Sequence, residues 1–98
     1  MRIFAWNEEK NRWLFTYRSI SFDDVVNAIT GKGLLDITPN PNMKRYPHQY
    51  VFFIQHKKYV YMVPFVQKSV RYFLKTIIPT RKYLKQYKHV MNKEDHEK

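Results

Sequence analysis

The chain has 98 residues, of which 44% are hydrophobic and 17% aromatic, and a formal net charge of +10 at pH 7. This apolar content suits one folded domain rather than a disordered chain, and the lack of cysteine excludes disulfides, thiolate catalysis and cysteine-based zinc sites. No apolar run approaches the ~18 residues that span a bilayer, and the N-terminus shows no long apolar signal segment, so we expect a cytoplasmic protein that does not enter a membrane.

The N-terminal third predicts a strand followed by two helices. Residues 1–6 alternate between two faces, which is typical of a strand. Asn7 is a suitable N-cap for a helix over residues 8–17, because two glutamates follow it in the first turn. We expect three large side chains of this helix to face the core: Trp13, Leu14 and Tyr17. The pattern Ser21-x-x-Asp24 is a capping box and predicts a second helix that ends at the two glycines of the chain.

The middle of the chain predicts a β-hairpin. After a brief strand and a proline-containing loop, residues 48–56 and 59–66 form two β-rich runs. Lys57 and Lys58 would form the turn between them, although this turn lacks the usual glycine. Pro64 predicts a bulge or a sheet edge in the second strand, because proline cannot donate to a ladder.

The C-terminal third predicts a strand that leads into a basic helix. Residues 70–78 alternate with period two, and Pro79 would end the strand and suit the first turn of the helix. An apolar stripe then recurs at helical spacing: Tyr83, Leu84, Tyr87, Val90 and Met91. Arg81 would lie at the junction of strand and helix, where a cation and unpaired backbone N–H groups both suit a phosphate.

This order of elements predicts a single α+β domain over residues 1–91. Two N-terminal helices and a C-terminal helix would pack on one face of a mainly antiparallel sheet of four to five strands. The polar residues 92–98 are expected to form a disordered tail.

The positive charge is concentrated in one part of the chain. Residues 37–93 contain no aspartate or glutamate and twelve lysines or arginines. Such a field attracts polyanions, nucleic acid above all. Solubility, or attraction to an acidic partner protein, would explain the same charge.

Two segments of the chain resemble the BrnT family of type II toxins, within the RelE/ParE toxin superfamily. The N-terminal segment, IFAWNEEKNRWLFTYRSISFDDVVNAI, is similar to the opening pattern of the family at these positions: Phe4, Trp6, Lys10, Arg18, Ser21, Phe22, Asp23 and Asp24. The C-terminal segment, IIPTRKYLKQY, resembles the segment before the last helix of the family, with Arg81 on the family arginine. The resemblance implies a RelE-like fold.

The resemblance also implies the toxin component of a toxin–antitoxin system, an mRNA endoribonuclease that inhibits translation. The implied partners are a small DNA-binding antitoxin, RNA, and operator DNA reached only through the antitoxin complex; whether the mRNA must be ribosome-bound stays open. Tyr87 stands where the family often has a glutamate, so an inactive homologue that only binds antitoxin or nucleic acid is the alternative. A toxin of the same fold with another target, such as a DNA topoisomerase, is a third possibility.

Cleavage of RNA by attack of the 2′-OH requires a base, a cation near the developing phosphorane charge, and an acid for the leaving oxygen. The carboxylate-free span offers four candidates for these roles: Arg81 for the phosphorane charge, and His48, Tyr87 and Lys75. Candidates for RNA binding are Lys44, Arg45, Tyr46, Arg71, Lys82 and Lys85, in which the tyrosine would stack on a base. Each of three candidates could instead have a purely structural role. Arg81 could form an ion pair, Tyr87 could occupy a core position, and His48 could lie at a solvated strand end. The histidines lack metal-ligand spacing, so we expect neither a metal nor another cofactor.

Overall fold

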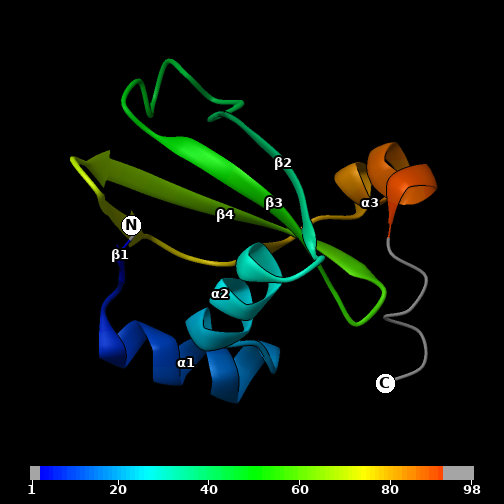
Figure 1. Ribbon diagram of the computed structural model, residues 1–98, viewed down its shortest axis with the longest axis horizontal. Coiled ribbons are helices and arrows are strands. Elements are labelled where there is room, and N and C mark those ends of the chain that lie inside the picture. Colours follow the sequence, from blue (N-terminus) through cyan, green and yellow to red (C-terminus); the bar gives the residue numbers. More distant parts are fainter. Residues whose placement is uncertain (1–2, 92–98) are drawn as a thin grey trace.

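The computed structural model describes residues 3–91, and the expected tail at 92–98 lies outside this range. The elements follow in this order: β1 (Ile3–Ala5), α1 (Glu8–Arg18), α2 (Phe22–Thr30), β2 (Leu34–Pro39), β3 (Tyr50–His56), β4 (Tyr59–Lys68), β5 (Arg71–Leu74), β6 (Ile78–Pro79), α3 (Arg81–Tyr87) and a 3-10 turn (Lys88–Val90) (Figure 1). No helix within the described range is both long and apolar enough to cross a membrane.

The strands form one mixed sheet in the order β1-β5-β4-β3-β2, and the short β6 pairs with β4. The β1–β5 pair is parallel, whereas the other pairs are antiparallel. The predicted α+β class is therefore confirmed, with three helices and a mixed sheet.

The helices lie on both faces of the sheet, so the expectation that all of them share one face is wrong (Figure 1). Successive β3 residues point to opposite faces. Phe52 and Ile54 join the cluster that α1 and α2 cover, whereas Val51 and Phe53 join a second cluster that α3 covers. Because β3 is apolar on both faces, each face requires a cover, and α3 supplies the second one.

The inward face of α1 differs from the prediction. Leu14 is fully buried, but Trp13 is 43% exposed and Tyr17 is 70% exposed. The rings of Trp13 and Tyr17 lie 5.2 Å apart, and the Lys10 ammonium and the Arg18 guanidinium lie over the Trp13 ring. These aromatic side chains therefore contact neighbours on their own helix instead of the core.

Helix α2 begins as the sequence predicts. The Ser21 hydroxyl accepts from the backbone N–H of Asp24, and the Asp24 carboxylate accepts from the backbone N–H of Ser21, which is a complete capping box. The apolar face of α2 then meets the sheet through Phe22, Val25 and Ile29.

The predicted hairpin is confirmed, with Lys57 and Lys58 both at positive φ, 49° and 68°. Two central residues at positive φ are typical of a type I′ turn. No register shift occurs at Pro64, which pairs with Val51 inside a regular ladder, so the expected bulge is wrong there. Pro64 is tolerated because it lies where β4 changes its other partner, after the residues that pair with β6 and before those that pair with β5.

The predicted continuous strand over residues 70–78 is broken. Strand β5 ends at Leu74 and β6 begins at Ile78, and Leu74 and Ile77 belong to the same buried cluster, so the alternation changes phase across the break. Pro79 belongs to β6 and not to the helix, whose N-cap is Thr80.

The apolar stripe predicted for the last helix is largely confirmed. Four of its residues pack on the second cluster: Tyr83, Leu84, Tyr87 and Met91. The fifth, Val90, is 53% exposed.

Candidate functional site

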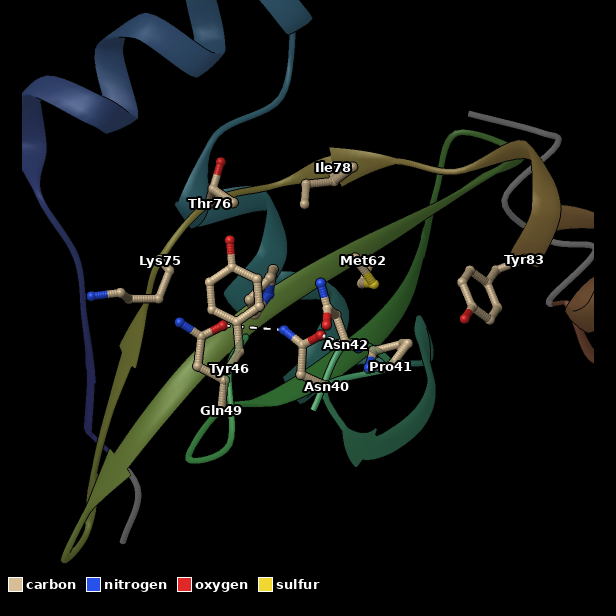
Figure 2. Close-up of a pocket in the computed structure, with 11 residues that line it drawn as sticks. Asn40, Pro41, Asn42, Tyr46, Gln49, Met62, Lys75, Thr76, Ile78 and Tyr83 are labelled. Carbon is tan, nitrogen blue, oxygen red and sulfur yellow. Dashed lines mark hydrogen bonds between the residues drawn. The ribbon is translucent and has the colours of Figure 1, made fainter. Parts of the chain in front are cut away.

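A cavity of about 400 Å³ lies on the face of the sheet that α3 covers; we call it the α3-side cavity (Figure 2). Four parts of the chain surround it: the loop between β2 and β3, strand β4, the segment from the β5–β6 break into β6, and the first turn of α3. Its lining comprises Asn40, Pro41, Asn42, Tyr46, Gln49, Met62, Pro64, Lys75, Thr76, Ile78 and Tyr83. Within residues 3–91, Lys75 is the only charged residue of this lining, and no carboxylate contributes to it.

Hydrogen bonds within the loop over residues 40–49 hold the loop side of the cavity in place. The backbone N–H of Asn40 donates to the carbonyl of Gln49 at 3.0 Å, and that of Tyr46 donates to the carbonyl of Asn42 at 3.0 Å. Asn40 is 5% exposed, and its amide also donates to the Gln49 side chain at 3.2 Å. The loop is thus closed on itself and presents Tyr46 and Gln49 to the cavity.

Cations accompany the aromatic rings in and around the α3-side cavity. The Arg45 guanidinium lies 5.5 Å from the centre of the Tyr46 ring, and the Lys82 ammonium lies 5.3 Å from the centre of the Tyr83 ring. The Lys75 ammonium lies 5.3 Å from the centre of the Phe73 ring, which places this charge at the rim rather than the middle of the cavity (Figure 2). Rings that can stack on a base next to cations that can meet a phosphate are the combination found in sites for single-stranded nucleic acid.

A second depression, of about 720 Å³, lies between α3 and the β3–β4 turn; we call it the basic groove. Four basic side chains and one histidine line it over an apolar floor of Leu84 and Met91: Lys58, Arg81, Lys85, Lys88 and His89. The predicted phosphate-binding arginine therefore lies in the basic groove, not in the cavity that contains Lys75.

Tyr87 is held in place by a hydrogen bond and by ring packing, as expected for a residue with a structural role. Its hydroxyl donates to the Asp36 carboxylate at 2.9 Å, and its ring lies 5.2 Å from that of Phe53. Burial, the hydrogen bond and the nearby carboxylate charge raise the pKa of Tyr87 to about 12. A phenol that keeps its proton at neutral pH, and already donates it to a carboxylate, is poorly suited to act as a general base.

The structure distributes the predicted site residues over several places. Tyr46 and Lys75 line the α3-side cavity, whereas Arg81 and Lys85 line the basic groove. The remaining candidates line neither depression: Lys44, Arg45 and His48 on the exposed loop, Arg71 at the start of β5, Lys82 on α3, and Tyr87 beneath α3.

Several lining residues were not among the candidates from sequence. The sequence predicts Tyr83 only in the apolar stripe, Asn40 only in a loop and Gln49 only in the first β-rich run; no local pattern marks them as neighbours of Lys75. Lys58, Lys88 and His89 are not among the site candidates from sequence either, although all three belong to the carboxylate-free span.

Residues 3–91 contain no group of three or more His, Asp or Glu side chains arranged to hold a metal ion. No family model matches the chain, and comparisons with curated proteins and with solved structures likewise found no significant match. The resemblance to the BrnT family thus rests on the sequence residues alone and stays a prediction.

Proposed function

We propose that the chain binds single-stranded RNA at the α3-side cavity and cleaves it, as the endoribonuclease toxin of a type II toxin–antitoxin system. The observation that carries this proposal is the composition of the cavity: tyrosines at 46 and 83, Lys75 at the rim, and no carboxylate to repel a phosphate. The carboxylate-free span around the cavity adds long-range attraction for a polyanion.

The chemistry would proceed by attack of the ribose 2′-OH on the adjacent phosphorus, with release of the 5′ oxygen. Lys75 is the cation that would stabilise the charge developing on the phosphorane. The hydroxyls of Tyr46 and Tyr83 are the side-chain oxygens of the cavity best suited to move a proton to or from the reacting oxygens.

Cations outside the cavity would hold the RNA backbone on either side. Lys44 and Arg45 extend from the exposed loop, and Lys82 lies beside Tyr83 on α3. Arg71, exposed at the start of β5, extends the positive surface along the sheet. Such contacts fix the register of a strand without reading its sequence.

The basic groove suits the antitoxin better than the substrate. Arg81, Lys85 and Lys88 surround the apolar floor, which matches an amphipathic segment with acidic residues along its edges. Binding of such a segment would weaken as salt screens the charges. A complex whose affinity is the same at low and high salt would contradict this assignment.

The alternative is a homologue that binds its partner without cleaving RNA. It is favoured by the separation of Arg81 from Lys75, and by the bond of Tyr87 to Asp36, because the groups predicted for catalysis do not converge on one point. Normal growth on expression, with intact binding to RNA and antitoxin, would favour this alternative.

Expression in cells with mapping of mRNA 5′ ends tests the proposal. Wild type should arrest growth and create new 5′ ends, Lys75→Ala should abolish both effects, and Arg81→Ala should retain them while it weakens antitoxin binding. Growth arrest without new ends, together with DNA damage signalling, would point to a different target. Circular dichroism of each purified variant controls for loss of fold.

A further inference from the structure

The amide of Gln49 has a fixed orientation in the α3-side cavity. The backbone N–H of Asn42 donates to Asn40 Oδ1 at 2.8 Å, so Asn40 must direct its Nδ2 elsewhere. That nitrogen donates to Gln49 Oε1 at 3.2 Å. A backbone donor therefore determines the orientation of the Asn40 amide, and Asn40 is only 5% exposed. Asn40 in turn determines the orientation of the Gln49 amide.

The consequence is that Gln49 offers the cavity a hydrogen-bond donor. Its oxygen faces Asn40, and its Nε2 lies at the other end of the amide, away from Asn40 (Figure 2). Gln49 Nε2 makes no side-chain hydrogen bond to another residue within the described range 3–91. A glutamine whose side-chain amide could rotate would bind either a hydrogen-bond donor or an acceptor of a ligand. Because the amide of Gln49 is fixed, it can bind only an acceptor.

We infer that Gln49 makes the cavity selective for a keto base, uracil or guanine, over an amino base, cytosine or adenine. This inference rests on the proposed function, because it requires a base of single-stranded RNA in the cavity. A base stacked against Tyr46 or Tyr83, with its phosphate near Lys75 at the rim, has its edge within the polar part of the lining. The keto oxygen of uracil or guanine accepts from Gln49 Nε2, whereas the amino group of cytosine or adenine places donor against donor.

Uracil and cytosine give the cleanest comparison, because their rings have the same size and differ only along one edge: uracil has O4 and an N3–H donor, whereas cytosine has a 4-amino group and an N3 acceptor. The probes are two fluorescent RNA heptamers with abasic sites at six positions and a central uracil or cytosine, together with a heptamer of seven uridines. Fluorescence anisotropy with the full chain measures the affinity of each. The wild type should bind the uracil probe about tenfold more tightly than the cytosine probe.

The variant Gln49→Glu inverts the group that is presented while retaining an oxygen for Asn40. Its carboxylate accepts from the cytosine amino group and repels the uracil oxygen, so the preference should change to cytosine although overall affinity falls. Gln49→Leu, which presents neither donor nor acceptor, should bind both probes equally. Lys75→Ala should weaken binding of both probes by the same factor, because it removes a phosphate contact and no base contact.

The outcomes separate this inference from the function on which it rests. Equal affinity of the wild type for both probes, with tight binding of the uridine heptamer, overturns the role of Gln49 and leaves RNA binding in place. A wild-type preference that persists unchanged in Gln49→Glu overturns it too. No binding of the uridine heptamer at low salt overturns the proposed function, and this inference with it.

Discussion

The substitution Tyr87→Phe tests whether Tyr87 supports α3 or takes part in catalysis. It removes the hydroxyl that donates to Asp36 and keeps the ring that packs against Phe53 and Tyr83. A hydrogen bond to a charged group contributes about 1.5–3 kcal/mol, and the partial exposure of this one reduces the expected loss to the bottom of that range or below it, about 1–1.5 kcal/mol. With a denaturant slope of about 1 kcal/mol/M, the urea midpoint should fall by about 1 M.

The pH dependence has a definite sign. The pKa of Tyr87 is raised from its usual value of 10.0 to about 12, so the folded state holds the phenolic proton more tightly than the unfolded state does. The stabilisation by Tyr87 is therefore fully present below pH 10 and is lost as the pH rises through about 12. The difference in unfolding free energy between wild type and Tyr87→Phe should be constant from pH 7 to 9 and shrink above pH 10. Taking this difference cancels the titration of groups that the two proteins share.

The control is the same substitution in an Asp36→Asn background. The asparagine oxygen can still accept from the backbone N–H of Ile37, which donates to Asp36 Oδ1 at 2.8 Å, but the charge is gone. Tyr87→Phe should cost less in this background, because the two substitutions remove the same interaction. RNA cleavage should persist in Tyr87→Phe. A variant of unchanged stability that has lost cleavage would refute the structural role and assign Tyr87 to the reaction.

Three further substitutions test the fold by urea denaturation. Ser69→Gly should stabilise the protein by about 0.5–1 kcal/mol, because Ser69 has φ of 58° at the first position of the β4–β5 turn, where glycine is unstrained; a loss of stability would contradict this. Ser21→Ala should cost about 1 kcal/mol, because it removes the N-cap of α2, and Ser21→Thr should restore most of it. Phe52→Ala should cost about 3–5 kcal/mol, because Phe52 is fully buried and stacks on Phe65 at 4.0 Å; a cost under 1 kcal/mol would place the core elsewhere.

Local sequence patterns predicted the elements whose signals lie within a few residues. The capping box at Ser21 predicted the start of α2, and the two apolar runs around Lys57-Lys58 predicted the hairpin. These signals succeed because caps, turns and period-two alternation are interactions between near neighbours in the chain. The patterns failed where the structure of a segment depends on contacts with residues far away in the sequence. The break between β5 and β6, and the exposure of Trp13, depend on how the sheet and its helices pack.

The candidate site shows the same division. The carboxylate-free span and its aromatic residues, read from the sequence, identified the charged part of the chain and included Tyr46 and Lys75. Only the tertiary structure placed those two with Tyr83 and Gln49, and placed Arg81 in a different groove. By itself, the sequence determined an α+β domain with a cationic C-terminal two thirds. Only the folded chain decided which cations share a cavity. One reason is that the segment containing Lys75 links β5 to β6, which pair with different parts of β4. The other is that α3 covers the opposite face of the sheet from α1 and α2.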